Sequence, residues 1–222
     1  EIGAYFNNSG NVRNVTVSSG NTGVYKTGTG TVDINGNIAG DGLGAFIDSG
    51  QLDVHGKIEM NGASIGILQT DGTVNANNKI TVASGGLGIR KTNGTTNIND
   101  SLVVNSGGTG VEQSDGTTTI SQMDVYGVGV RLGSGSLTLN GSTIRSGATG
   151  VLQAGGTSYL GSMSVLSGGT GVNHTGGNVT GGTITLNGSS KGILTNGASN
   201  TQFGTGLKII GNDDSGNKVG IH

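Results

Sequence analysis

The sequence predicts an all-β protein whose chain winds into a single right-handed parallel β-helix (solenoid) of about ten rungs. Its composition, an internal repeat and a short-range alternation of aliphatic residues together predict this fold. Glycine supplies 48 of the 222 residues, and Thr, Asn and Ser supply 27, 23 and 22. Since Gly costs roughly 1 kcal/mol at each helical position and Thr, Ser and Asn are also poor helix formers, a helical protein is excluded.

Two further features of the composition exclude disorder and favour continuous pairing of the backbone. Val, Ile, Leu and Phe together number 53 and the net charge is only −2, whereas disordered chains combine low hydrophobicity with high charge. Proline is absent, and its absence favours strands because proline cannot donate to a ladder. Cysteine is absent as well, so neither a disulfide framework nor a thiolate metal site is possible.

A glycine followed by a small aliphatic residue recurs along the whole chain and anchors each repeat. Its copies are Gly3-Ala4, Gly23-Val24, Gly44-Ala45, Gly66-Ile67, Gly88-Ile89, Gly110-Val111, Gly129-Val130, Gly150-Val151, Gly171-Val172, Gly192-Ile193 and Gly220-Ile221. The intervals between them run from 19 to 22 residues, except for the last, which is 28. A period of about 21 residues predicts a solenoid in which each repeat forms one turn.

Each repeat divides into three short runs and three corners, always in the same order. The run that holds the anchor ends at a turn such as 71–72, where Asp and Gly tolerate positive φ. The next run alternates with period two, as at 52–54, and this alternation predicts a strand. A second corner, often Asn-Gly as at 140–141, leads to a third run such as 80–82 and then to a Ser-Gly-Gly corner. We therefore expect three short strands in each rung.

Aligning the repeats predicts inward-facing columns that are almost wholly aliphatic. The column of the second run is Ile34, Val54, Ala76, Ile98, Ile120, Leu139 and Leu160. The column of the third run is Ile38, Ile58, Ile80, Leu102, Met123, Ile144, Met163 and Ile184. The anchor column extends from Val24 to Ile193. Because one rung cannot bury these side chains alone, stacking of rungs must form the core.

Two aspartates are the first candidates for a binding site. Asp33 and Asp53 occupy equivalent outward positions one rung apart, where stacked like charges repel, so a cation or a sugar could lie against them. Glycan-cleaving enzymes place paired carboxylates in such a way. The same column continues with residues that are not acidic, which favours a solvated face: Asn75, Asn97, Thr119, Thr138, Tyr159 and Thr180.

The column directly after the anchor is the second candidate. It places Tyr25, Phe46 and Leu68 on successive rungs, with Arg90 next to them. If the anchor aliphatics point inward, these side chains point outward and form an exposed apolar strip, which is typical of an interaction surface. The alternative is that a Gly-containing corner shifts the phase and turns some of them inward.

No enzyme, cofactor or metal site is expected from the remaining residues. The esterase pattern G-x-S-x-G occurs at 62–66 and 188–192, but it needs a strand-to-helix turn and a His partner, and the Gly and Ser content alone explains both matches. The three histidines, His55, His174 and His222, lie at unrelated positions of the repeat. Basic residues are scattered, so nucleic acid is not an expected partner. No apolar stretch approaches the ~20 residues that span a bilayer, so no membrane insertion is expected.

The whole chain resembles the passenger segments of Gram-negative autotransporters, which are exported by type V secretion. The resemblance rests on imperfect units of about 21 residues, rich in Gly-Thr-Gly-Val and Asn-Gly and free of Cys and Pro. It is greatest to self-associating adhesins and to the very large fusobacterial surface autotransporters. It implies secretion across the outer membrane and display at the bacterial cell surface.

We therefore expect residues 1–222 to form one β-helix segment, an internal slice of a longer passenger, with a loop insertion near 211–217. The expected function is a non-enzymatic adhesin stalk for attachment and aggregation, whose partner is a host or bacterial surface protein or glycan, or a second copy. The alternative is a glycan-binding or glycan-cleaving β-helix, such as a phage tail spike or a polysaccharide lyase. Ice binding requires a uniform column of Thr, and the outward columns here are mixed.

Overall fold

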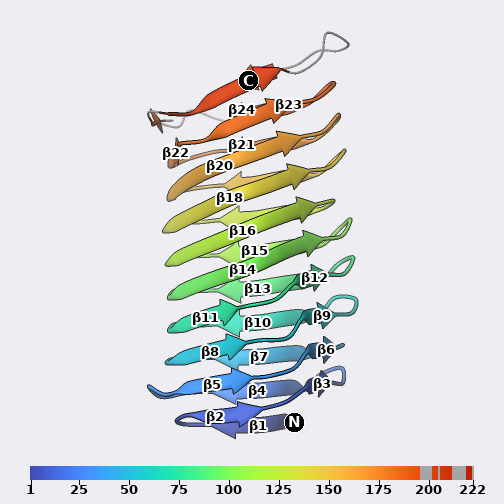
Figure 1. Cartoon of the computed structure of the whole chain (residues 1–222), viewed down its shortest axis with the longest axis vertical. Coiled ribbons are helices and arrows are strands. Elements are labelled where there is room, and N and C mark those ends of the chain that lie inside the picture. The colour runs from blue at the N-terminus through green and yellow to red at the C-terminus, as the bar shows by residue number, and fades with distance from the viewer. Residues whose placement is uncertain (196–201, 205, 212–218, 222) are drawn as a thin grey trace.

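The computed structural model of the chain describes residues 1–195, 202–204, 206–211 and 219–221. These residues contain strands and no helix, and every pairing between the strands is parallel. The chain coils into a solenoid of about ten turns, each stacked on the turn before it (Figure 1). The predicted all-β fold, its period of about 21 residues and its number of rungs are confirmed.

One sheet is built from the runs that contain the anchor, and we call it sheet A. Its strands follow one another in chain order, one from each rung. They are β1 (Ile2–Phe6), β4 (Thr22–Lys26), β7 (Leu43–Ile47), β10 (Ile65–Gln69), β13 (Leu87–Lys91), β15 (Thr109–Gln113), β17 (Val128–Leu132), β19 (Thr149–Gln153), β21 (Thr170–His174), β24 (Lys191–Thr195) and β27 (Val219–Ile221).

The second and third runs form one larger sheet, sheet B. In the first four rungs and near the C-terminus the two runs are separate strands. The second-run strands are β2 (Gly10–Val12), β5 (Thr31–Ile34), β8 (Gln51–Val54), β11 (Thr73–Ala76), β22 (Asn178–Thr180) and β25 (Gln202–Phe203). The third-run strands are β3 (Val15–Val17), β6 (Ile38–Gly40), β9 (Ile58–Met60), β12 (Ile80–Val82), β23 (Thr183–Leu186) and β26 (Lys208–Gly211).

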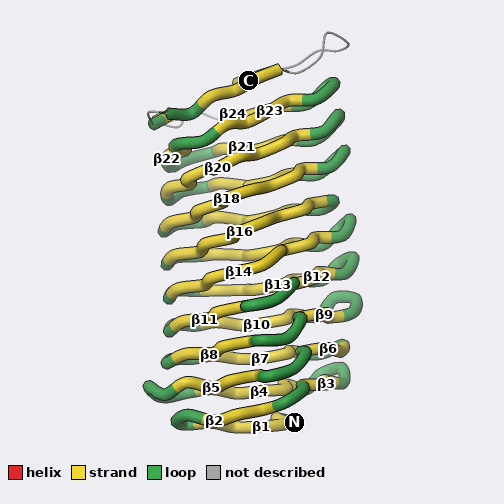
Figure 2. The backbone as a smooth tube through the Cα atoms, viewed as in Figure 1, coloured by secondary structure: helices red, strands yellow, loops and turns green. Residues whose placement is uncertain are grey.

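In the four middle rungs the two runs merge, so the prediction of three short strands in every rung is wrong there. The merged strands are β14 (Thr95–Val104), β16 (Thr117–Val125), β18 (Ser136–Ile144) and β20 (Thr157–Val165). Figure 2 shows them as continuous strand, where the rungs below have a loop. Asn140-Gly141, predicted as a corner, lies inside β18.

In β16, β18 and β20 the connection between the two runs is one residue shorter than in the lower rungs, whereas β14 is continuous despite its longer connection. Three residues separate the inward Val54 from Ile58, whereas two separate Ile120 from Met123. The shorter connection leaves no residue for a bend, and the chain passes straight from one run to the next. Where β14 with its longer connection pairs with β16, the register shifts between Ile98 and Ser101, which is a β-bulge.

The predicted core columns are confirmed, with one exception. All members of the second-run column are buried, and Ile58, Ile80 and Leu102 stack in register. In the third-run column, however, Met123 pairs with Ser142 and not with Ile144, which instead continues the column of Val125. The prediction of Ile144 was wrong because it took the first aliphatic residue of the run, whereas the position that pairs with Met123 holds a serine. The Oγ atom of Ser142 is consequently buried and has no hydrogen-bond partner.

The anchor glycines are required by lack of space. A Cβ atom on Gly110 would lie 2.5 Å from the carbonyl oxygen of Gly129 in the next rung and 2.7 Å from Cδ2 of the buried Leu102. The same two obstacles, the next anchor carbonyl and a core side chain of the third run, face Gly44 and Gly150. The recurrent glycine therefore marks the place where sheet A lies closest to the third run.

The predicted loop insertion near 211–217 falls, apart from Gly211 at the end of β26, outside the described residues. His222 also lies outside them.

Candidate functional site

The column that follows the anchor points outward, as one of the two alternatives predicted. Tyr25, Phe46, Leu68 and Arg90 pair in succession across sheet A, and the first three are half-buried. The rings of Tyr25 and Phe46 stack with their centroids 4.7 Å apart. Tyr5 of β1 extends the stack at 5.5 Å from Tyr25, and 59% of it is exposed. Sequence reasoning missed Tyr5, although it follows the anchor Gly3-Ala4 in the same way.

A second apolar column lies beside the first. Leu43, Ile65 and Leu87, the first residues of β7, β10 and β13, are in register and half-buried. Period two would turn them inward with Ala45, but two successive inward positions, Gly44 and Ala45, separate Leu43 from the outward Phe46. Sequence reasoning missed this column because of that irregularity. We call the two columns together (Tyr5, Tyr25, Phe46, Leu68, Leu43, Ile65 and Leu87) the apolar strip.

Charged side chains continue the column beyond the apolar strip. The Nε atom of Arg90 donates to Oε2 of Glu112 at 2.8 Å, and Arg131 follows in register. The side chains of Arg90 and Glu112 are 52% and 41% exposed, so this ion pair contributes little to stability. Arg90 is therefore engaged by its neighbour in the next rung rather than by the apolar strip.

The two predicted aspartates do lie in register, but hydrogen bonds from protein groups occupy their carboxylates. Asp33 pairs with Asp53 across β5 and β8. The Nε2 atom of His55 lies 3.2 Å from Asp33 Oδ1. Asp53 accepts two hydrogen bonds from the Gln51 amide, at 3.0 and 2.8 Å, and one from Asn75 Nδ2 at 2.7 Å. These neighbours stabilise the stacked carboxylates.

A column of buried polar side chains lies on the core-facing side of sheet A, and each member follows its anchor aliphatic residue by two positions. Its members are Lys26, Gln69, Lys91, Gln113, Gln153 and His174. Each one reaches the corner where its strand ends. The Nε2 atom of Gln69, for example, donates to the carbonyl oxygens of Gly72 and Thr95 at 2.9 and 3.0 Å, and its Oε1 accepts from the Thr96 hydroxyl. The column satisfies carbonyl groups that the corners would otherwise leave unpaired inside the protein.

The lysines of this column carry perturbed amines. Lys91 Nζ donates to the carbonyl oxygens of Gly94 and Thr117 at 2.9 and 2.6 Å. Burial lowers the pKa of Lys91 to about 8, although the negative charge of Asp115 opposes the shift. Burial also lowers the pKa of Lys26. No sequence pattern announced these residues, since the same column holds Ile47 and Leu132 in other rungs.

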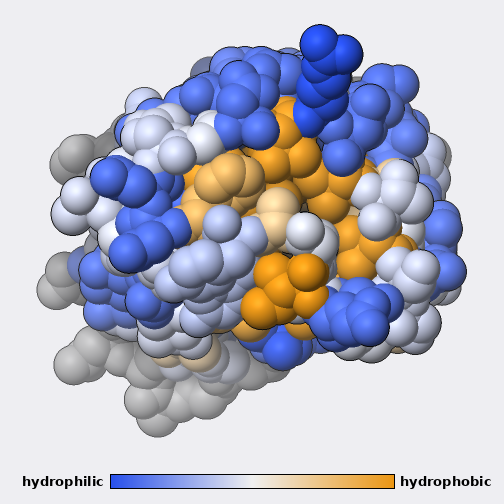
Figure 3. Space-filling model, turned by 90° about the horizontal axis from the view of Figure 1, so that it is seen from below, coloured by the Kyte–Doolittle hydropathy of each residue, from blue (hydrophilic) through white to orange (hydrophobic). Residues whose placement is uncertain are grey.

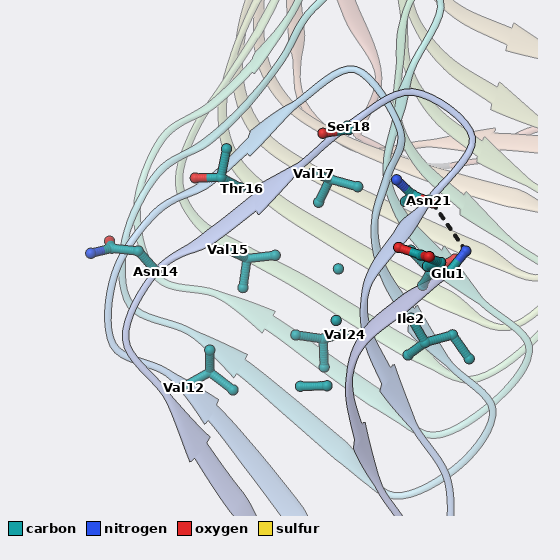
Figure 4. Close-up of a pocket in the computed structure, with 14 residues that line it drawn as sticks. Glu1, Ile2, Val12, Asn14, Val15, Thr16, Val17, Ser18, Asn21 and Val24 are labelled. Carbon is teal, nitrogen blue, oxygen red and sulfur yellow. Dashed lines mark hydrogen bonds between the residues drawn. The ribbon is translucent and has the colours of Figure 1, made fainter.

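A hollow lies at the N-terminal end of the coil, where the first rung leaves the core uncovered. Figure 3 views this end and shows apolar residues gathered within a polar rim. The hollow has a volume of about 340 Å³. Val12, Val15, Val17 and Val24 point into it (Figure 4), and the amino group of Glu1 bonds to Asn21 Oδ1 at 3.0 Å. Its aliphatic floor offers no chemistry for catalysis.

The serines at the centre of the two G-x-S-x-G matches are Ser64 and Ser190. Both are buried: Ser64 Oγ donates to the carbonyl oxygen of Asn61 in its own corner, and Ser190 Oγ has no hydrogen-bond partner. Among the described residues no group of three or more His, Asp or Glu side chains could hold a metal ion. The same residues include no helix that is long and apolar enough to cross a membrane.

Comparison with family models, with curated proteins and with solved structures finds no match to this chain.

Proposed function

We propose that this chain is a non-enzymatic stalk segment of a bacterial surface adhesin, and that copies of it associate side by side. Its expected place is the outside of the cell, after export across the outer membrane, as the resemblance to autotransporter passengers implies. No cofactor is needed for this function. The repeated fold supports the proposal, because a coil of about ten rungs presents each outward column as a long, straight line of side chains.

The apolar strip is the observation that carries the proposal. It extends over the first five rungs of sheet A and combines two stacked aromatic contacts with a parallel line of Leu and Ile. Contiguous exposed apolar residues mark interaction surfaces in soluble proteins. Rungs repeat every ~4.8 Å, so two rods in contact along the strip add a similar weak apolar contact on each of its five rungs, and the sum holds them together.

Removing the strip should abolish the association. We expect the wild-type sedimentation coefficient to rise with protein concentration, and that of the double variant Phe46→Ser/Leu68→Ser to stay at the monomer value. Both side chains face outward, so the fold should survive, which circular dichroism checks. The matched control is Leu152→Ser, at an equivalent half-buried position outside the strip, which should behave like wild type. A wild-type chain that stays monomeric at the highest concentration contradicts the proposal.

Surface display is tested separately on the cells that produce the protein. An antibody raised against this segment should stain intact cells as strongly as permeabilised ones. Staining that appears only after permeabilisation would contradict the proposed location and leave the association experiment unaffected.

A further inference from the structure

A polar groove crosses the outer face of sheet B in the upper middle rungs. Its volume is about 270 Å³, and its walls carry hydroxyl and amide groups. The residues that matter are Gln122, Ser162, Ser164, Thr183 and Thr185, with Gly141 at the floor. They lie on β16, β18, β20 and β23, whose outward positions stand in register. The lining contains no charged side chain.

Gly141 is the reason for the hollow. In its outward column it stands between Gln122 and Ser162, where every other rung nearby carries a side chain. A Cβ atom on Gly141 would lie 3.2 Å from Gln122 Nε2, so the Gln122 amide extends over the glycine. The Gln122 amide is thereby placed at the floor of the groove, in the same column as the hydroxyl groups of Ser162 and Thr183.

Tyr159 forms an aromatic platform beside this groove. Its Cε2 atom lies 2.3 Å from the place that a Cβ atom on Gly181 would occupy, so one face of the ring packs on that glycine. Half of Tyr159 is nevertheless exposed, at 50%, which leaves the opposite face open. Tyr159 is outside the groove lining itself, but it lies on the same outward face of β20, three residues before Ser162 of the lining.

The other tyrosines stack on aromatic rings or lie beneath a guanidinium group. Tyr5 and Tyr25 stack on each other at 5.5 Å, and Tyr25 also stacks on Phe46. The guanidinium of Arg145 lies over the ring of Tyr126, 5.3 Å from its centroid. Tyr159 thus combines an open ring face with neighbouring hydrogen-bonding groups.

We propose that Tyr159 and the groove form a subsite for a neutral oligosaccharide. A pyranose presents polarised C–H groups on its faces, which the negative face of an aromatic ring attracts, and hydroxyl groups around its edge. Ser and Thr hydroxyls and the Gln122 amide both donate and accept hydrogen bonds, as sugar hydroxyls require. The lack of charge in the lining disfavours an acidic polysaccharide. Of the described charges beside the lining, Asp124 and Arg145 satisfy each other at 2.7 and 2.9 Å. The exposed Lys208 of β26 is in register with Thr183.

This inference adds a glycan partner to the proposed adhesin and places it on sheet B, whereas self-association uses sheet A. A groove of about 270 Å³ lies below the ~300–1,000 Å³ of sites that enclose drug-sized ligands. We therefore expect weak binding by one copy, with a dissociation constant on the order of 1 mM, and strong attachment only where many copies act together.

The test is a titration of isotope-labelled protein, followed by backbone amide chemical shifts. The probes are three neutral oligosaccharides, maltohexaose, cellohexaose and chitohexaose, together with an acidic one, hexagalacturonate. At least one neutral probe should shift the amides of Ser162 and Thr183 at millimolar concentration, while the acidic probe should not. The proposal is overturned when no neutral probe shifts them, or when hexagalacturonate shifts them most.

Three variants make the result specific. Tyr159→Ala should weaken the binding of the neutral probe at least tenfold, and Gly141→Val, which fills the floor without touching Tyr159, should do the same. Tyr126→Ala, which removes an exposed tyrosine from outside both the apolar strip and the groove lining, should bind like wild type. Wild-type affinity in both Tyr159→Ala and Gly141→Val overturns the subsite. Because Tyr159 lies outside the apolar strip, the sedimentation of Tyr159→Ala should match wild type, which separates a failure here from a failure of the proposed association.

Discussion

Replacing the anchor glycine Gly110 with alanine should lower the free energy of unfolding by about 3 kcal/mol, as overpacking of a filled core does. The added Cβ atom would approach the Gly129 carbonyl oxygen to 2.5 Å, and that oxygen belongs to backbone that the neighbouring rungs hold in place. Leu102 and Val104 close the other side, with atoms at 2.7 and 2.9 Å. Relief requires β15 to separate from β17 and sheet A to move away from the third run, which opens the core. Urea denaturation measures the change.

Two other glycines serve as controls for this experiment. Gly85 has a φ of +75° and open space around its Cβ position, so Gly85→Ala isolates the conformational cost, about 1–2 kcal/mol. At Gly133 the nearest atom to the Cβ position is 3.2 Å away and no positive φ is required, so Gly133→Ala should change the free energy of unfolding by less than about 1 kcal/mol. Equal costs for Gly110→Ala and Gly133→Ala would show that rung spacing does not explain the anchor.

Replacing Lys91 with glutamine should raise the free energy of unfolding at pH 7 by about 2 kcal/mol, because the variant buries no charge. Gln69, one rung below, shows that a glutamine fits. It donates to Gly72 and Thr95, which correspond to the Gly94 and Thr117 carbonyls bound by Lys91. The Oε1 atom of Gln69 accepts a hydrogen bond from the Thr96 hydroxyl. Thr118 pairs with Thr96 in the next rung, so its hydroxyl can donate in the same way to a glutamine at position 91.

The advantage of Lys91→Gln should shrink as pH rises. Below pH 8 the lysine is charged in both the folded and the unfolded chain, and the folded chain carries the full cost of the buried charge. The pKa of Lys91 is about 8 in the folded chain and 10.5, the ordinary value for lysine, in the unfolded chain. Between these two pH values the unfolded chain still holds the proton, whereas the folded chain has lost it. The free energy of unfolding of wild type therefore rises through this interval towards that of the variant.

Chemical denaturation of both proteins at pH 7 and pH 10 checks this dependence. Lys57→Gln is the control, since Lys57 is 50% exposed and its replacement should change stability by no more than about 0.5 kcal/mol at pH 7. A constant difference between wild type and Lys91→Gln at the two pH values would contradict the assignment of a lowered pKa to Lys91.

The candidate site could be predicted only in part. Tyr25, Phe46 and Leu68 were found because each directly follows an anchor, and their outward direction is a local property of the strand. Leu43 belongs to the same surface but was missed, because the strand turns two successive residues, Gly44 and Ala45, towards the core. In the sequence, Tyr159 stands out only as one member of a mixed column. The orientation of its ring depends on packing against Gly181 of the next rung, a residue outside its own strand.

By itself, the sequence determined the coil, the length of a rung and which aliphatic residues stack in the core. Those features follow from short-range periods, since alternation within a strand and recurrence of the anchor require no knowledge of neighbouring rungs. Only the tertiary structure decided where Asn140-Gly141 runs straight, that Ser142 and not Ile144 stands beside Met123, and that Lys91 is buried. The reason is that corners and buried polar groups are shaped by the rungs above and below, whose contacts join residues about 20 positions apart.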